Sequence, residues 1–164
     1  MELKPTNGGG SIARVGEAAR AAGLAIVVKR MGESTRTAEE AATQCGVTVN
    51  RIVKSLVFQG ASSGRLMLFL IPGDCQMDLA KAAIVAGETL KRADARMVRD
   101  ETGFAIGGVS PLGHRIAIRT FADAALLEQP TVWAAAGAHD AVFEAEPKAL
   151  VKAAGATIAD LAAD

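Results

Sequence analysis

The first candidate for a chemical role is a lysine, Lys54, in a predicted strand that is otherwise mostly apolar. The segment VKSLVF (53–58) alternates like a strand, which places Lys54 on the same face as Leu56 and Phe58. Lysine is almost never fully buried unless it is paired. Two interpretations stay open. The ammonium group reaches solvent at the strand end, or it lies at a pocket mouth and offers a cation to a phosphate or a carbonyl oxygen.

A glycine-rich segment, TGFAIGGVSPLGH (102–114), is the second candidate, with four glycines and one proline. Gly107 and Gly108, beside Ser110 and Pro111, can expose successive backbone N–H groups, which together bind an anion or a carbonyl group. The segment is not a P-loop, because no GK[ST] follows, and its spacing is not that of the dinucleotide fingerprint. A functional loop and a structural turn both remain open.

The other reactive side chains have no partner at a spacing typical of a catalytic or metal-binding motif. His114 and His139 are candidate acids or bases by residue type, yet neither has a spaced partner, and a lone loop histidine is more often a surface residue. Ser110 lies in Gly-Val-Ser-Pro and not in a G-x-S-x-G elbow. Cys45 and Cys75 show no CxxC spacing, so no zinc site is expected. Two unpaired cysteines without a signal peptide predict a reducing cytoplasm.

The overall charge argues against a large nucleic-acid footprint. The 164 residues carry 18 basic and 18 acidic side chains, with five Phe, one Trp and no Tyr to stack on bases. Residues 1–119 nevertheless carry 16 Lys/Arg against 11 Asp/Glu, and residues 120–164 carry 2 against 7. This asymmetry is either a chance imbalance on a solvated surface or a basic face for a phosphate-bearing ligand. No apolar stretch is long enough to predict a membrane-spanning helix, and no membrane partner is expected.

Capping signals and hydrophobic periodicity predict the elements that position these residues. Thr37 and Glu40 form a capping box, Asp78 should begin a helix, and Gly46 and Gly87 should each end one. The expected helices are 12–22 behind a Ser11 cap, 38–45, 79–86, 94–102, 122–128 and 147–155. The expected strands are 24–30, 51–59, 65–71, 88–93, 115–119, 131–136 and 141–146, with 51–59 and 65–71 forming a hairpin.

This mixture of elements predicts an α/β (α+β) fold in which helices pack on one mixed sheet. The length suits one domain. We expect a flexible N-terminus over residues 1–10 and a single domain over 11–164.

Three segments together resemble the YbaK/ProX family of aminoacyl-tRNA deacylases, which includes the editing domain inserted in some bacterial prolyl-tRNA synthetases. They are TRTAEEAA (35–42), IVKSLVF (52–58) and the glycine-rich segment 102–114. A strand lysine followed by TGxxxGGxSPxG is a specific combination, whereas either motif alone would be weak. The similarity runs from about Leu24 to the C-terminal helix.

The resemblance implies a mixed, mostly antiparallel sheet or partial barrel, and a cytoplasmic enzyme that hydrolyses the ester of a mischarged tRNA, usually tRNA(Pro). It implies that Lys54 holds the terminal adenosine or its phosphate and supports the transition state, while the backbone of Gly107 and Gly108 holds the aminoacyl ester. The predicted substrate-binding residues are Thr35, Arg36, Ser110, Pro111 and His139. Neither a metal nor an organic cofactor is expected, since an aminoacyl ester is already activated.

The implied partners are the 3′ acceptor end of a mischarged tRNA and, as a candidate protein partner, prolyl-tRNA synthetase, with no DNA. The segment 137–143 departs from the Gly-Leu-Asp stretch of the cysteine-specific branch, which leaves alanine, serine and threonine as candidate residues beside cysteine. One alternative is a non-catalytic module on the same fold that binds tRNA or a synthetase. Another is an unrelated small-molecule hydrolase.

Overall fold

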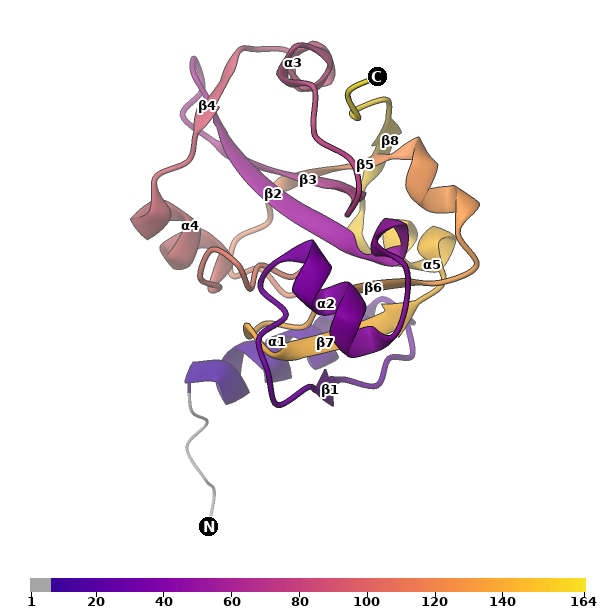
Figure 1. Ribbon diagram of the computed structural model, residues 1–164. Coiled ribbons are helices and arrows are strands. Elements are labelled where there is room, and N and C mark those ends of the chain that lie inside the picture. The colour runs from indigo at the N-terminus through magenta and orange to yellow at the C-terminus, as the bar shows by residue number, and fades with distance from the viewer. Residues whose placement is uncertain (1–6) are drawn as a thin grey trace.

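Five α-helices, two 3-10 helices and eight strands follow one another along residues 7–164, which the computed structural model describes (Figure 1). In chain order they are α1 (Asn7–Ala21), β1 (Lys29–Arg30), α2 (Ala38–Cys45), η1 (Val49–Arg51), β2 (Val53–Gly60), β3 (Leu66–Pro72), α3 (Leu79–Ala86), β4 (Leu90–Arg92), α4 (Ala95–Thr102), β5 (Arg119–Asp123), η2 (Ala124–Glu128), β6 (Val132–Ala135), β7 (Ala141–Ala145), α5 (Pro147–Ala154) and β8 (Thr157–Ala159).

The helix boundaries predicted from capping residues are confirmed for α2 and α3. The Thr37 hydroxyl accepts a hydrogen bond from the Glu40 amide, and the Glu40 carboxylate accepts one from the Thr37 amide, so the capping box is formed. The Asp78 carboxylate caps α3. Gly46 and Gly87 end these helices at φ values of 70° and 82°, a left-handed conformation in which glycine has no side chain to strain.

The predicted hairpin of β2 and β3 is also confirmed, and it places Lys54 opposite Ile71 in an antiparallel register. Strand β3 is buried along its whole length. Its even-numbered residues 66–70 belong to a core cluster shared with α1, α4 and the smaller sheet, while Met67, Phe69 and Ile71 face a second cluster beneath α3. Burial on both faces explains why this strand reads as a continuous apolar run.

The strands form two sheets and not the single sheet expected from the sequence. One has the order β4-β2-β3-β5-β8, with antiparallel pairs at β4-β2-β3 and parallel pairs at β3-β5-β8. The other is antiparallel, in the order β1-β7-β6. An isolated bridge between Ile52 and Trp133 joins them. The expected mixed α/β fold is confirmed, and the described strands do not close into a barrel.

Two expected strands are wrong. In the expected strand 24–30, only Lys29 and Arg30 pair with β7. Residues 24–28 have no strand partner: Leu24, Ile26 and Val28 pack beside the core, whereas the Val27 side chain is 72% exposed. The expected strand 115–119 becomes β5, which begins at Arg119. The first residues of the expected strand instead contact the end of α4, where the Ile116 amide donates a hydrogen bond to the Glu101 carbonyl. Strand β8 was not predicted.

The first helix begins earlier than its predicted cap. Helix α1 starts at Asn7, so Ser11 lies inside it, and its hydroxyl donates to the Gly103 carbonyl. The predicted flexible N-terminus is therefore helical from residue 7, and residues 1–6 lie outside the described part of the chain. Within residues 7–164, no helix combines the length and the apolar character needed to cross a membrane.

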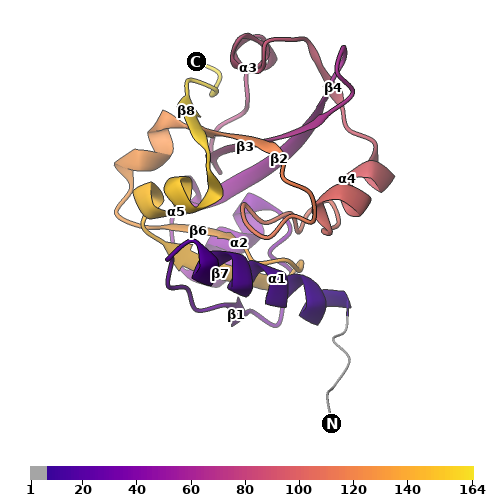
Figure 2. The ribbon, with the colours of Figure 1, turned by 180° about the vertical axis from the view of Figure 1, so that it is seen from behind.

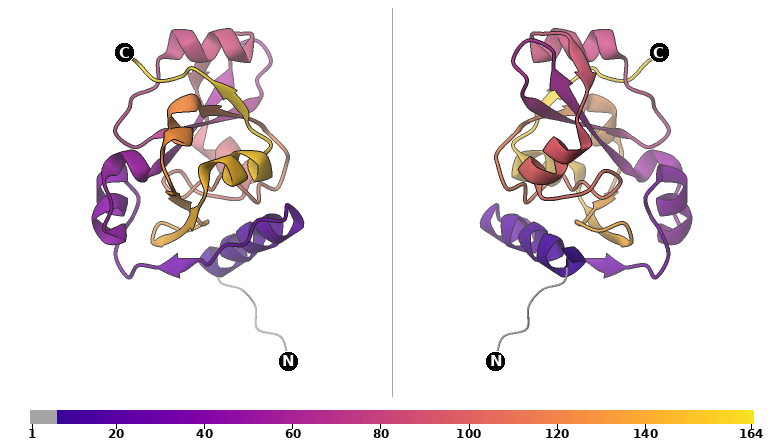
Figure 3. Two further views of the ribbon diagram at one scale, coloured as in Figure 1. Left: turned by 90° about the vertical axis from the view of Figure 1, so that its right-hand side faces the viewer. Right: turned by 90° about the vertical axis from the view of Figure 1, so that its left-hand side faces the viewer.

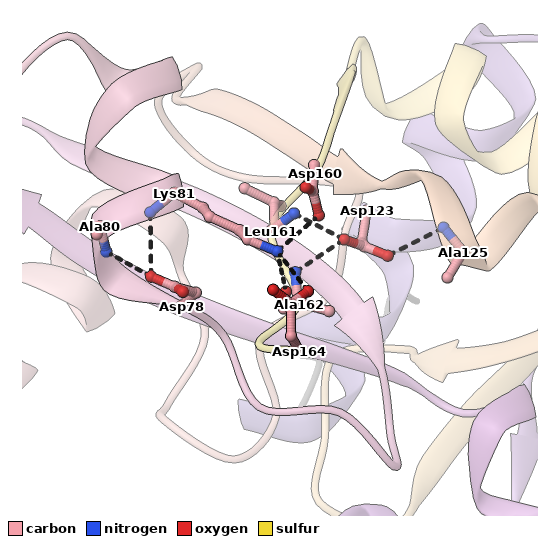
Figure 4. A network of polar contacts seen from close by, with 9 residues as sticks. All are labelled: Asp78, Ala80, Lys81, Asp123, Ala125, Asp160, Leu161, Ala162 and Asp164. Carbon is pink, nitrogen blue, oxygen red and sulfur yellow. Dashed lines mark hydrogen bonds and ion pairs between the residues drawn. The ribbon is translucent and has the colours of Figure 1, made fainter.

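The view from behind (Figure 2) and the two side views (Figure 3) place α1 and β1 at one end of the molecule and α3 at the other. The C-terminal segment returns to the α3 end and is held there by Asp123 (Figure 4). The buried Asp123 carboxylate accepts hydrogen bonds from the amides of Leu161 (2.8 Å), Ala162 (3.0 Å) and Ala125 (2.9 Å). The core of the larger sheet and the last residues of the chain are thus fixed together.

Candidate active site

Lys54 lies at the start of β2, where the two sheets meet, and it lines a cavity of about 360 Å³. We call this cavity the lysine pocket; its walls include Thr35, Arg36, Glu39, Val53, Lys54, Ser55, Gly107, Val109, Trp133 and Ala134. The Lys54 side chain is half-buried and makes no hydrogen bond or ion pair with any residue of 7–164. Lys54 therefore lines a pocket, as one of the two interpretations expects, and its contact with a ligand stays a prediction.

The glycine-rich segment is held rigidly by its own polar side chains. The buried Thr102 hydroxyl donates to the Val98 carbonyl (2.6 Å) and accepts from the Phe104 amide (3.0 Å). The Ser110 hydroxyl accepts from the Leu112 amide (3.2 Å), and His114 Nε2 donates to the Ser110 carbonyl (2.7 Å). These contacts fix both ends of the segment, so Gly107 and Gly108 are presented on a preformed loop.

The two central glycines of this loop differ in role. Gly107 has a φ of +95°, a backbone conformation that favours glycine, and a Cβ there would lie 2.6 Å from Cγ of the exposed Arg36 side chain. The Gly107 amide has no hydrogen-bond partner among residues 7–164, and Gly107 is one of the residues that line the lysine pocket. The Gly108 amide, in contrast, already donates to the Ala105 carbonyl (2.9 Å). Gly107 therefore offers a free N–H group to a ligand, and Gly108 does not.

Ser110 and Pro111, which we predicted to bind substrate, are buried and line neither of the two cavities described in this section. The Ser110 hydroxyl and carbonyl are both used within the loop. Their position fits a role in shaping the loop that presents Gly107. Direct contact of either residue with a substrate stays a prediction.

Thr35 and His139 join two loops beside the lysine pocket. The backbone amide and the hydroxyl of Thr35 both donate to the His139 carbonyl, at 2.6 Å and 2.9 Å. This contact fixes the loop that carries Arg36 against the turn between β6 and β7. The exposed His139 side chain lines a second, larger cavity on the far side of Arg36.

That second cavity, of about 570 Å³, we call the arginine cleft; its walls include Ser11, Arg14, Arg36, Arg99, Gly103, Ile106, Gly108, Arg115 and His139. Arg36 and Ile106 line both cavities, and the Gly107–Gly108 peptide separates them, with one glycine on each side. The structure therefore brings Thr35, Arg36, Lys54 and Gly107 together in the lysine pocket. It places Gly108 and His139 in the adjoining arginine cleft.

His114 and the two cysteines are unsuited to catalysis where they lie. His114 packs edge-on against Phe104 at 5.9 Å. Burial lowers its pKa, the hydrogen bond to the Ser110 carbonyl opposes this, and the charge of Arg14 lowers the pKa further. Cys45 and Cys75 are free thiols whose pKa values are raised by burial, which disfavours the thiolate needed for nucleophilic attack.

Several pocket residues were missed by sequence reasoning. The Ser55 hydroxyl is buried beside Lys54 without a hydrogen-bond partner. Glu39 brings an exposed carboxylate to the pocket rim. The alternation of β2 could have identified Ser55 as a core-facing polar residue, but nothing in the sequence linked Arg14, Arg99 and Arg115 to one cleft.

The site can polarise a carbonyl oxygen without a serine or cysteine nucleophile. It combines one unpaired ammonium group, one free backbone amide and a largely apolar floor, an arrangement that stabilises negative charge more strongly than water would. In the described part of the chain, Ser110 and His114 contact each other only through the Ser110 carbonyl, so these two residues do not form a catalytic pair. This geometry suits hydrolysis of an activated ester by positioned water.

Comparison with known proteins shows which family the chain resembles. The family model of the aminoacyl-tRNA editing domain matches residues 32–153. A crystal structure of a protein described as a candidate trans-editing enzyme for prolyl-tRNA synthetase superposes with a TM-score of 0.88 at 43% identity, covering 99% of this chain and 100% of that one.

Two relatives connect the chain to bacterial proteins. The uncharacterized protein YwhH of Bacillus subtilis (strain 168) is 33% identical over 117 residues, which span 71% of this chain and 74% of YwhH. A proline–tRNA ligase of Thermosipho africanus (strain TCF52B) is 35% identical over 81 residues, or 49% of this chain, and that stretch is only 14% of the ligase. The matched family model, which contains Lys54 and the whole glycine-rich loop, confirms the resemblance drawn from three short segments. The chain belongs to the aminoacyl-tRNA editing domain family.

Proposed function

We propose that this protein is a trans-editing deacylase that hydrolyses the ester of mischarged aminoacyl-tRNA in the cytoplasm. The substrate we propose is tRNA(Pro) carrying a small wrong amino acid. The observation that carries the proposal is the lysine pocket, where the unpaired Lys54 ammonium and the free Gly107 amide line one cavity. The family, and the likeness to a candidate trans-editing enzyme and to a stretch of proline–tRNA ligases, support the choice of tRNA.

In the proposed reaction, water attacks the carbonyl carbon of the aminoacyl ester. The Gly107 amide donates to the carbonyl oxygen as it becomes an oxyanion, and the Lys54 ammonium stabilises the same charge or the adjacent phosphate. The bond from the carbonyl carbon to the ribose oxygen then breaks, and that oxygen takes up a proton as free tRNA leaves. The neighbouring ribose hydroxyl of the substrate orients the attacking water, which is why the chain needs no catalytic triad.

The walls of the lysine pocket support a small amino acid. Val53, Val109, Trp133 and Ala134 are each buried and belong to the cores on either side, so they leave little freedom for the pocket to widen. Such a pocket excludes larger side chains by steric repulsion, whereas one methylene group more or less changes binding by only about 1–3 kcal/mol. Alanine, serine, threonine and cysteine therefore all remain in the proposed substrate class.

The test is deacylation of preformed Ala-, Ser-, Thr- and Cys-tRNA(Pro) by wild type, Lys54→Ala and the control Lys91→Ala. Lys91 is exposed on β4 and lines neither cavity. We expect wild type and Lys91→Ala to release at least one amino acid well above the buffer rate, and Lys54→Ala to lose that release. Release of none of the four by wild type contradicts the enzyme, and tight tRNA binding in that case would favour a regulatory module.

The same assay tests the proposed role of prolyl-tRNA synthetase as a partner. Adding the synthetase should raise the apparent affinity of the protein for tRNA without changing which amino acids are released. An unchanged rate at all substrate concentrations would contradict such a partnership.

A further inference from the structure

The arginine cleft concentrates positive charge, which is offset in part by the attraction between Glu40 and Arg36. Its four arginines come from distant segments: Arg14 from α1, Arg36 from the loop before α2, Arg99 from α4, and Arg115 from just after the glycine-rich segment. Among residues 7–164, no Asp or Glu lines the cleft. The ion pairs formed within residues 7–164 use Arg30, Arg51 and Lys81, and none of the four cleft arginines.

The chain holds this charge in place against its own repulsion. Arg14 donates to the carbonyl oxygens of Gly103 (2.6 Å) and Gly113 (3.2 Å), and its guanidinium lies 5.0 Å from the centre of the Phe104 ring. Burial, and then the positive charge of Arg115, lowers the pKa of Arg14. Carbonyl groups orient a guanidinium without cancelling its net charge, so the cleft stays cationic.

The cleft directly adjoins the lysine pocket. Arg36 and Ile106 line both cavities, and Gly107 and Gly108 form the wall between them. A ligand whose ester lies against Lys54 can therefore extend past Arg36 into the cleft. In the proposed substrate, the groups beyond the terminal nucleoside are the phosphates of the single-stranded 3′ end.

None of the cleft-lining residues within 7–164 is Phe, Tyr or Trp. Without aromatic rings to stack on, bases of a single strand have little to bind there. Guanidinium groups instead match phosphate oxygens in both charge and geometry. The cleft thus has the chemistry of a backbone site that positions a strand without reading its sequence.

We propose that the arginine cleft binds the backbone phosphates of the single-stranded 3′ end of the tRNA, next to the terminal nucleoside. The ligand class is an RNA phosphodiester, and Arg99 and Arg115 are its main exposed contacts. This proposal rests on the proposed deacylase function for the direction in which the strand enters. Arg14 serves as a positioning residue that fixes the loop side of the cleft.

The test compares Arg99→Gln/Arg115→Gln with a control pair, Arg65→Gln/Arg92→Gln, which removes the same charge. The four arginines to be replaced are all exposed, and Arg65 and Arg92 line neither the arginine cleft nor the lysine pocket. Binding of uncharged tRNA(Pro) is measured at several salt concentrations, and hydrolysis is measured with alanyl-tRNA(Pro) and with alanyl-adenosine, which has no phosphate. Arg14 is left intact because its loss would disturb the loop itself.

We expect the cleft pair to weaken tRNA binding about tenfold or more. The slope of log affinity against log salt should fall in magnitude by about 1.4, because each phosphate that an arginine neutralises on a single strand contributes about 0.7 to that slope. The cleft pair should also raise KM for alanyl-tRNA(Pro) while leaving hydrolysis of alanyl-adenosine at the wild-type rate. The control pair should leave all of these quantities near their wild-type values.

Equal weakening by the cleft pair and the control pair would overturn the proposal, because it would show a diffuse charge effect. An equal loss of activity on alanyl-adenosine would also overturn it, since the cleft would then belong to the ester site. If wild type hydrolyses neither substrate, the proposed function fails. In that case, the salt dependence of tRNA binding still tests whether the cleft binds RNA phosphates.

Discussion

Replacing Gly107 by alanine tests whether the loop conformation that presents the free amide is required. The added Cβ would lie 2.6 Å from Arg36 Cγ and 3.0 Å from Cδ, and the residue would have to keep a φ of +95°. Arg36 is exposed and can move aside, so the backbone conformation dominates the cost. A left-handed conformation costs a residue with a side chain about 1–2 kcal/mol. In a chain of this size that lowers Tm by roughly 2–8 °C.

Gly108→Ala is the matched control for this substitution. Gly108 is not in the positive-φ region, and its Cβ would meet only Ala138 and His139 backbone atoms at 3.5–3.6 Å, which is ordinary van der Waals contact. Thermal unfolding followed by circular dichroism should therefore show a loss for Gly107→Ala and almost none for Gly108→Ala. Deacylation should fall for Gly107→Ala as Arg36 and the amide are displaced. Equal stability of the two variants would refute the reasoning.

Three further predictions concern buried polar groups. Asp123→Ala should lower the free energy of unfolding by about 3 kcal/mol in chemical denaturation, because it orphans three amides that now donate to the carboxylate (Figure 4); a change within error would contradict this. Burial lowers the folded-state pKa of His114 below its usual value of 6.5. The contribution of this residue to the free energy of unfolding should therefore be complete above pH 6.5 and should be lost as the pH falls toward the folded-state pKa. His114→Gln should show a smaller change in Tm between pH 7.5 and 5 than wild type does. Ser55→Ala should raise the free energy of unfolding by about 1 kcal/mol, since its buried hydroxyl has no partner, and a loss of stability would mean that the hydroxyl is satisfied.

Local signals predicted the fold well wherever the chain decides its own conformation. The capping box at Thr37, the cap at Asp78 and the glycine stops at Gly46 and Gly87 act over four or five residues, and all are confirmed. The β2–β3 hairpin was predicted for the same reason, because a short turn joins its two strands.

The errors lie where distant segments decide the structure. Residues 24–28 are as apolar as a buried strand, yet only Lys29 and Arg30 find a partner, in β7 more than a hundred residues away. Strand β8 depends on parallel pairing with β5, and no pattern within 157–159 indicates it. The division into two sheets likewise depends on long-range pairing.

The candidate site also contains some residues that local sequence signals predicted and others that only long-range packing brings together. Lys54 stood out in the sequence because a charged residue is rare in an apolar strand, and Gly107 because of its glycine-rich context. The arginine cleft was not predicted as a site, since Arg14, Arg99 and Arg115 come from separate elements. The excess of basic residues over 1–119 pointed toward it, and Arg36, Gly108 and His139, which line the cleft, were predicted individually as site residues.

The central claim is that Lys54 supports ester hydrolysis in the lysine pocket. Its most direct test is single-turnover deacylation of the best mischarged tRNA(Pro) at saturating enzyme, which separates the chemical step from binding. The account predicts that Lys54→Ala lowers this rate about 10²–10³-fold, while uncharged tRNA still binds through the arginine cleft. A single-turnover rate for Lys54→Ala equal to that of wild type would contradict the account.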